Sequence, residues 1–378
     1  MDALTVTALI FTASALLVHL LTTGIGIVRT LKPNRAPSRA RWNAEPVTIL
    51  RPICGLDPFD EATLRTTFHL DHPNYEIIFC SAREHDPAVP LVRALMQQYP
   101  GIRSRLLIGD DRSTPNPKLN NLIKGWNAAT TPWVIMADSN VLMPPTYIGE
   151  MLAAFRSGTG LVCSPPVGSQ PDGAWAEMEC AFLNTYQARW QLAADAFGFG
   201  FAQGKSMLWK KSDLDEAGGI GALALEIAED AAATKIVRQR GLRVRLVDRP
   251  YAQPLGRKTA AQVWQRQVRW ARLRRSTFIP YYLLEILSGS LAPALAAAYA
   301  GASFGLNPVA SIAALWVVWY GAEAALAKSA DWHMTLASPA AWLARDLALP
   351  VLWIQGFMGN RFTWRGNEMT VATAGGKP

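Results

Sequence analysis

The run VIMADSN at residues 134–140 decides the fold, because it is an apolar stretch that ends in an acid and an amide. Such a run is typical of a strand buried on both faces of a sheet. Shorter apolar runs precede it, with helical patterns between them, at 47–50, 75–80 and 105–108. This alternation predicts an α/β fold with a parallel sheet covered on both sides. Ligands bind at the carboxyl ends of such strands, where Asp86 and Asp138 are expected.

Two later segments carry charged side chains. IAED at 227–230 places Glu229 and Asp230 after an apolar lead-in, and RQVRW at 266–270 places two arginines and a tryptophan in a basic segment. Each piece also has a structural explanation. An aspartate at a strand end is commonly a cap, acids at a helix start complement the helix dipole, and surface arginines can meet lipid headgroups. Because the pieces follow one another in one α/β chain, we favour a shared site.

Composition limits the classes of function. The 378 residues are 50% hydrophobic and 17% charged, and the apolar excess lies at the two ends. The net charge of +8 is compatible with nucleic acid, anionic lipid or a phosphate-bearing substrate. The four cysteines lack metal-ligand spacing. GKS at 204–206 is not a P-loop, because the first glycine of that motif would fall at Phe199.

The N-terminal residues predict a membrane anchor. Residues 4–28 are apolar and long enough to span a bilayer, which favours a retained anchor at 1–28 over a cleaved signal peptide. A basic linker at 29–45 follows, with Arg29, Lys32, Arg35, Arg39 and Arg41. The positive-inside rule places this linker, and a catalytic domain at 46–256, in the cytoplasm.

The C-terminal third predicts further membrane segments. Residues 257–280 form a basic, tryptophan-containing segment, expected to be an interfacial helix. Basic residues mixed with aromatics also suit single-stranded nucleic acid, but the apolar stretches at 281–303 and 306–326 favour a bilayer as the partner and exclude nucleic acid. In the membrane region 281–378, Arg345 and Asp346 interrupt a third apolar stretch at 337–358. We expect this stretch to lie in the interface, although a third span is the alternative.

The sequence resembles the ceramide glucosyltransferases and the bacterial lipid glycosyltransferases grouped with them. The resemblance covers about residues 50–364 and rests on RPICGLDP at 51–58, LDHPNYE at 70–76, DPA at 86–88, NPKLNNL at 116–122, Asp138-Ser139, IAED at 227–230, RQVRW at 266–270 and Trp364-Arg365. It implies a GT-A type nucleotide-sugar transferase domain with N-terminal and C-terminal transmembrane helices. It further implies transfer of one glucose from UDP-glucose to ceramide with inversion, by an integral protein of a bacterial inner membrane.

The chemistry of such a transfer assigns roles to these residues. The leaving diphosphate needs a divalent ion, Mg²⁺ or Mn²⁺, for which Asp138 is expected as ligand and Asn140 as a neutral helper. Asp230 is expected to be the base that takes the acceptor proton. Arg269 can bind phosphate oxygens, and Trp270 can stack on the sugar.

The resemblance places Asp86 on the nucleotide and makes Arg269 and Trp270 part of a closing motif. Lys118, Asp138 and Arg266 are expected to contribute to donor binding with them.

Three alternatives stay open. The acceptor could be diacylglycerol or a hopanoid, the enzyme could be a processive polysaccharide synthase, or the chain could be a basic membrane-surface module without activity. The sequence determines neither the lipid, the sugar, the metal nor the oligomeric state.

Overall fold

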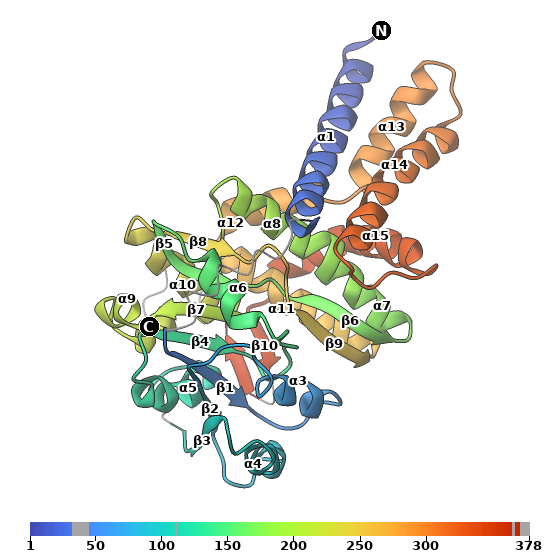
Figure 1. Cartoon of the computed structure of the whole chain (residues 1–378). Helices are drawn as coiled ribbons and strands as arrows, with labels where there is room; N and C mark the ends of the chain where they lie inside the picture. Colours follow the sequence, from blue (N-terminus) through green and yellow to red (C-terminus); the bar gives the residue numbers. More distant parts are fainter. Residues whose placement is uncertain (32–44, 111, 365–366, 371–378) are drawn as a thin grey trace. The chain divides into compact units, whose positions relative to one another are not determined.

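A computed structural model of the chain describes residues 1–31, 45–110, 112–364 and 367–370. Most of the basic linker predicted at 29–45 therefore lies outside the described residues. The chain divides into two compact units, each of which is described by itself (Figure 1). The sheet unit comprises Lys32–Ser169 and Ala194–Gly256, and the helical unit comprises Met1–Leu31, Gln170–Ala193 and Arg257–Pro378. Residues 170–193, inside the predicted catalytic segment 46–256, thus group with the helical unit.

The sheet unit is built on seven strands in the order β3-β2-β1-β4-β7-β5-β8. Their bounds are β1 Val47–Ile53, β2 Tyr75–Ser81, β3 Arg103–Ile108, β4 Trp133–Ala137, β5 Thr159–Cys163, β7 Ser206–Lys210 and β8 Arg243–Leu246. β1 runs parallel to β2 and β4, whereas β7 runs antiparallel to both β4 and β5. The predicted α/β class is confirmed, but the expectation of an all-parallel sheet is wrong at β7. A short apolar run predicts a strand and carries no information on its direction.

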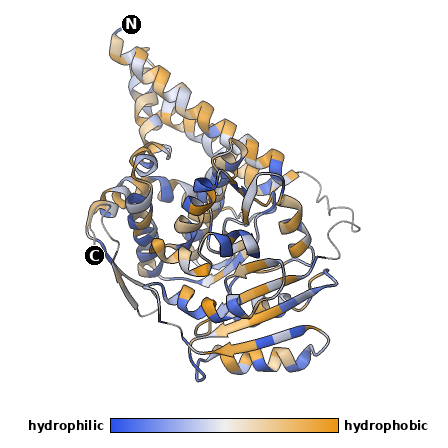
Figure 2. Cartoon of the chain, turned by 90° about the vertical axis from the view of Figure 1, so that its left-hand side faces the viewer, coloured by the Kyte–Doolittle hydropathy of each residue, from blue (hydrophilic) through white to orange (hydrophobic). Residues whose placement is uncertain are grey.

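Helices cover this sheet, and their sequences explain where they begin. They are α3 Asp60–Thr66, α4 Ala88–Gln98, α5 Pro117–Ala128, α6 Tyr147–Ala154, α9 Lys211–Glu216, the 3₁₀ helix Ile220–Leu225 and α10 Glu229–Gln239. Asn116 caps α5 through its side chain, and Pro117 occupies the first turn. The core packs fully buried strand residues such as Ile49, Ile77 and Ile135 against α4 and α6. Figure 2 shows these strands as largely hydrophobic.

The helical unit combines three separate segments of the chain. Its elements are α1 Ala3–Leu31, α7 Ala174–Ala181, a π-helix Phe182–Ala188, α8 Arg189–Ala196, α11 Ala260–Thr277, α12 Ile279–Leu284, the 3₁₀ turn Glu285–Leu287, α13 Leu291–Ser303, α14 Pro308–Ser329, α15 Ser338–Phe357 and the hairpin of β10 Arg361–Trp364 with β11 Asn367–Thr370. A further two-stranded sheet pairs β6 Val167–Asp172 with β9 Ala252–Arg257. The predicted basic helix corresponds to α11, which Thr259 and Gln262 begin with a capping box.

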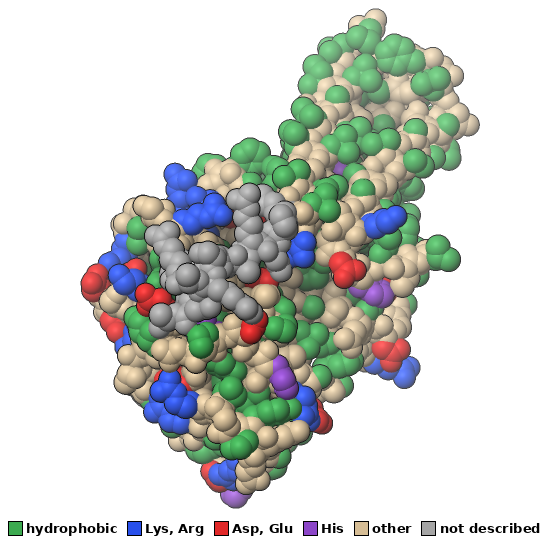
Figure 3. All heavy atoms as spheres, in the orientation of Figure 1, with side chains coloured by type: hydrophobic (Ala, Val, Ile, Leu, Met, Phe, Trp, Pro, Cys, Tyr) green, Lys and Arg blue, Asp and Glu red, His purple; other side chains and the backbone are tan. Residues whose placement is uncertain are grey.

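Two helices, α1 and α14, are long and apolar enough to cross a membrane. They pack against each other and against α13, and Figure 3 shows hydrophobic side chains over this part of the surface. The stretch predicted as one span at 281–303 is bent by 42° between Leu287 and Leu291. It counts as a third candidate if the bent pair is one span. α15 is not among these candidates, and its interfacial position stays a prediction.

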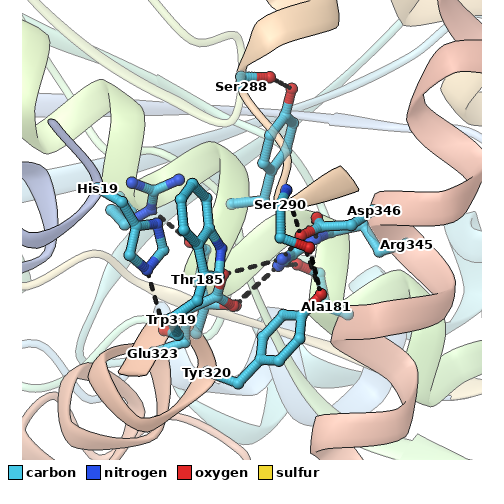
Figure 4. A network of polar contacts seen from close by, with 12 residues as sticks. His19, Ala181, Thr185, Ser288, Ser290, Trp319, Tyr320, Glu323, Arg345 and Asp346 are labelled. Carbon is cyan, nitrogen blue, oxygen red and sulfur yellow. Dashed lines mark hydrogen bonds and ion pairs between the residues drawn. The ribbon is translucent and has the colours of Figure 1, made fainter. Parts of the chain in front are cut away.

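The charges in the middle of α15 form a closed network, shown in Figure 4. Arg345 donates to both carboxylate oxygens of Glu323 on α14, at 3.0 and 2.9 Å, and to Asp346 at 2.8 Å. Asp346 also accepts from the Ser290 amide and the Tyr320 hydroxyl. Arg345, Glu323 and Asp346, hereafter the arginine network, are at most 1% exposed. Each charge is paired inside the unit, so the network ties α14, α15 and the start of α13 together.

Candidate active site

Four segments of the sheet unit converge at the end of β4. They are the loop Asp138-Ser139-Asn140 after β4, the loop 203–205 before β7, the first turn of α5 and the first turn of α10. The sequence predicted residues of three of these segments as parts of the site, namely Asp138 with Asn140, Lys118 and Asp230. Two of the meeting points are helix N-termini, where backbone amides and the helix dipole favour negative charge.

Lys118 lies at the centre of this site. Its ammonium is 2.7 Å from Asp138 Oδ1, 2.7 Å from Glu229 Oε1 and 2.8 Å from the carbonyl oxygen of Gly204. Burial alone would lower the pKa of Lys118, but Asp138 and Glu229 outweigh burial and raise it. Lys118 is therefore a permanent cation that joins its own segment, the first turn of α5, to the other three.

A second lysine, which the sequence analysis did not assign, holds the other side of Asp138. Lys205 Nζ is 2.9 Å from Asp138 Oδ2 and 3.1 Å from Asn140 Oδ1. Burial would raise the pKa of Asp138, but Lys118 and Lys205 together lower it well below its usual range. Asp138 therefore carries its charge at all physiological pH values.

The two predicted metal ligands point at one cation. Asp138 Oδ2 and Asn140 Oδ1 both contact the same ammonium, so their oxygens converge on a single position. Carboxylate and amide oxygens suit Mg²⁺ and Mn²⁺, and such ions commonly use one or two protein ligands together with substrate phosphates and water. Across the described ranges, no group of three or more His, Cys, Asp or Glu side chains could hold a metal. The residues thus fit a divalent ion that takes its other ligands from a bound diphosphate.

The two acids of IAED have different partners. Glu229 is paired with Lys118 and accepts from the Asn116 amide at 3.1 Å. Asp230 forms no ion pair with any residue in the described part of the chain, and accepts from the backbone amides of Gly204 at 3.2 Å and Ala231 at 2.8 Å. Burial, with the adjacent charge of Glu229, raises the pKa of Asp230 to about 7. Asp230 is therefore the acid suited to accept a proton near neutral pH.

Gly204 connects the base to the cation cluster. Its amide donates to Asp230 and its carbonyl accepts from Lys118. A β-carbon here would lie 2.7 Å from Glu229 Oε1, so a larger residue would require the Glu229 carboxylate to shift. The sequence analysis rejected GKS as a P-loop and gave Gly204 no role of its own.

A buried arginine supports the loop after β4. Arg51, which is fully buried in β1, donates to the carbonyl of Ser139 at 2.8 Å, and Thr63 donates to the same oxygen. Asp86 lies at the end of another strand, as predicted, but contacts Gly55 and Ala88 backbone amides. Asp86 thus joins the loop after β1 to the start of α4, and its partners lie outside the Lys118 cluster.

The arginine motif lies on α11 of the helical unit. Arg266 is 2.7 Å from Glu179 and its guanidinium lies over the Trp270 ring at 5.0 Å. Arg269 makes no hydrogen bond with any residue that the structure describes, and burial together with Arg266 lowers its pKa to about 10. Arg269 therefore keeps its donors available, whereas Arg266 is engaged within the unit.

The sequence model of glycosyl transferase family 21 matches residues 14–377. The chain belongs to this family. It is 27% identical over 336 residues to ceramide glucosyltransferase 3 of Caenorhabditis elegans, which covers 87% of this chain and 73% of that protein. It is 29% identical over 299 residues to the ceramide glucosyltransferase of Komagataella phaffii, over 64% of this chain and 59% of that protein. The resemblance to ceramide glucosyltransferases is thereby confirmed, and the chain is a glycosyltransferase.

The fold also matches a solved structure. The mannosyltransferase PcManGT from Pyrobaculum calidifontis, in complex with GDP-Man and Mn²⁺, superposes with a TM-score of 0.52 at 16% identity, over 94% of this chain and 97% of that one. At this identity the likeness concerns the fold, which is of the GT-A type.

Proposed function

We propose that this protein transfers a single glucose from UDP-glucose to the hydroxyl of ceramide, with inversion at the anomeric carbon. One observation carries the proposal: Asp230 is an unpaired carboxyl group beside a cation-held Asp138, in a chain of glycosyl transferase family 21. The names of the similar proteins in Caenorhabditis elegans and Komagataella phaffii support glucose and ceramide.

The proposed reaction is one displacement. The acceptor oxygen attacks the anomeric carbon as Asp230 takes the hydroxyl proton. The bond from that carbon to the diphosphate oxygen breaks, and its electron pair leaves with UDP. A positioned base contributes about 10²–10⁴-fold to such a step. Glu229 does not compete for this role, because Lys118 and Asn116 already bind its carboxylate.

The donor side of the proposed site consists of the charged and polar side chains around the end of β4, together with Asp86. Asp138 and Asn140 would hold a divalent ion, which when bound neutralises charge on the leaving diphosphate. We assign donor binding to Lys118, Asp138 and Asp86, with the ribose and base of the nucleotide on the Asp86 side.

The motif on α11 completes the proposed donor site. Arg269 has free donors for phosphate oxygens, and Arg266 orients Trp270 by stacking over its ring, so that the indole can contact the sugar.

The proposed location is a bacterial inner membrane, with the sheet unit in the cytoplasm. The two helices that can span a bilayer, and the basic residues after the first of them, support this orientation. The exposed apolar side chains of α12, such as Leu283 and Leu284, suit a position at the membrane surface.

Incubation of membranes with labelled UDP-sugars and a panel of lipids tests the proposal. We expect label from UDP-glucose in one product of ceramide mass plus one hexose. Label in diacylglycerol or a hopanoid would identify that lipid, and not ceramide, as the acceptor. A polymeric product would indicate a polysaccharide synthase. No UDP release with any lipid would indicate a binding module without activity.

A further inference from the structure

Lys205 occupies the point at which the two proposed metal ligands converge. Its ammonium contacts Asp138 Oδ2 and Asn140 Oδ1, while Lys118 takes the other oxygen of Asp138. Both carboxylate oxygens are thus bound to ammonium groups. We propose that Lys205 is an exchangeable resident cation: it holds the metal position while no donor is bound, and a divalent ion replaces it when the diphosphate arrives. This inference rests on the proposed function and extends it to a residue that determines when metal binds.

The Lys205 ammonium and a divalent ion cannot occupy this position together. A divalent ion bound to the same two oxygens would lie within a few ångströms of the ammonium, where like charges repel strongly. The carboxylate of Asp138 also has no unoccupied oxygen to offer, because Lys118 binds Oδ1 at 2.7 Å. A metal can therefore enter only as the Lys205 ammonium leaves.

The backbone around Lys205 is fixed, so the exchange is a side-chain rotation. The Lys205 carbonyl accepts from the Asp138 amide at 3.1 Å, and the next residue, Ser206, pairs with Ala137 in the sheet. The side chain has four rotatable bonds and is 16% exposed, against 8% for Lys118. Lys205 is thus the more exposed of the two lysines, and rotation of its side chain can bring the ammonium, still protonated, to a phosphate oxygen.

This arrangement makes metal and donor binding cooperative. Two protein oxygens and a competing ammonium leave the site with low affinity for a free ion. The donor diphosphate supplies further oxygen ligands for the ion and a new partner for Lys205, so each ligand increases the affinity for the other. A merely structural lysine would produce no such coupling.

Binding of Mn²⁺ to the purified full chain, followed by the EPR signal of the free ion, tests the proposal. Without UDP, we expect Lys205→Met to bind Mn²⁺ at least about tenfold more tightly than the unmodified protein, because the competing charge is gone. Lys205→Arg, which keeps the charge, should resemble the unmodified protein. Lys210→Met is a matched control, because Lys210 lies five residues away at the opposite end of β7 and is 51% exposed. With UDP, the unmodified protein should gain Mn²⁺ affinity.

Two results would overturn the inference. Equal Mn²⁺ affinity of Lys205→Met and the unmodified protein, with thermal melts that show both folded, would mean that Lys205 does not compete. Binding of UDP by the unmodified protein without any uptake of Mn²⁺ would mean that Lys205 replaces the metal permanently. Neither result touches the proposed function, which fails only if no sugar reaches a lipid in the transfer assay.

Discussion

The molecule contains two clusters of buried charge that differ in how completely they are paired. In the arginine network of the helical unit, Arg345 contacts both Glu323 and Asp346, and all three side chains are at most 1% exposed. In the sheet unit, Lys118 and Lys205 both contact Asp138, which is 23% exposed, and Lys118 also contacts Glu229. Asp230 forms no ion pair with a residue that the structure describes.

This difference distinguishes the arginine network, which stabilises the fold, from the cluster around Asp138, which is suited to catalysis. A buried charge that is fully paired holds helices in one arrangement, and removal of a partner leaves an uncompensated ion. A buried carboxyl without a partner lowers stability unless its altered pKa serves a purpose, and such groups concentrate at functional sites. The sequence indicated both clusters as candidates for function, because Arg345 and Asp346 interrupt an apolar stretch and Asp138 ends one.

The largest expected effect is the loss of turnover when Asp230 is replaced. Asp230→Asn should lower the turnover number about 10²–10⁴-fold and leave UDP-glucose affinity nearly unchanged, because the base acts on the acceptor. Initial rates with saturating donor and ceramide, together with calorimetric donor binding, measure both quantities. Glu229→Gln is the matched control, and should mainly weaken donor binding through Lys118. A turnover above about a tenth of the original in Asp230→Asn would assign the base elsewhere.

A substitution in the arginine network should lower the free energy of unfolding. Arg345→Met leaves Glu323 and Asp346 buried without a cation, which should cost about 3–5 kcal/mol of unfolding free energy. Thermal unfolding in detergent detects this loss. Arg93→Met removes an exposed ion pair with Glu84 and should cost less than about 1 kcal/mol. Equal shifts in the two variants would show that the arginine network is not a structural tie.

The pH dependence of turnover sharpens the contrast. The raised pKa of Asp230 means that its carboxyl group is protonated below about pH 7 and cannot accept a proton there. Turnover should thus fall about tenfold per pH unit below pH 7 and level off above it. Binding of UDP-glucose should persist to pH 5, since the pKa of Asp138 stays low. A turnover that is constant between pH 5 and pH 8 would contradict the assigned base.

The smallest effect concerns Arg269 of the helical unit. Arg269→Lys keeps the charge and removes the fork of donors, so one hydrogen bond to phosphate should be lost, which corresponds to about tenfold in kcat/KM for the donor. Steady-state rates at varied UDP-glucose measure it. Arg272→Lys is the control, because Arg272 contacts the backbone carbonyls of Met358 and Arg361. Similar losses in both variants would remove the donor role of Arg269.

Local patterns in the sequence were sufficient for the elements and for several members of the site. Apolar runs predicted β1, β2, β3 and β4, and the cap Asn116-Pro117 explains the start of α5. The acids at strand and helix ends identified Asp138 and Asp230, because position relative to an element is a property of neighbouring residues. The long apolar stretches likewise predicted α1 and α14 as candidate spans.

The tertiary structure alone decided which charges are paired. Lys205 contacts Asp138 across 67 positions of the chain and Gly204 contacts Asp230 across 26, and no local pattern predicts such contacts. The direction of β7, the bend before α13 and the partner of Arg345 are decided in the same way. Pairing depends on distances of about 3 Å between groups that are remote in sequence, and those distances exist only once the sheet and the helices have packed.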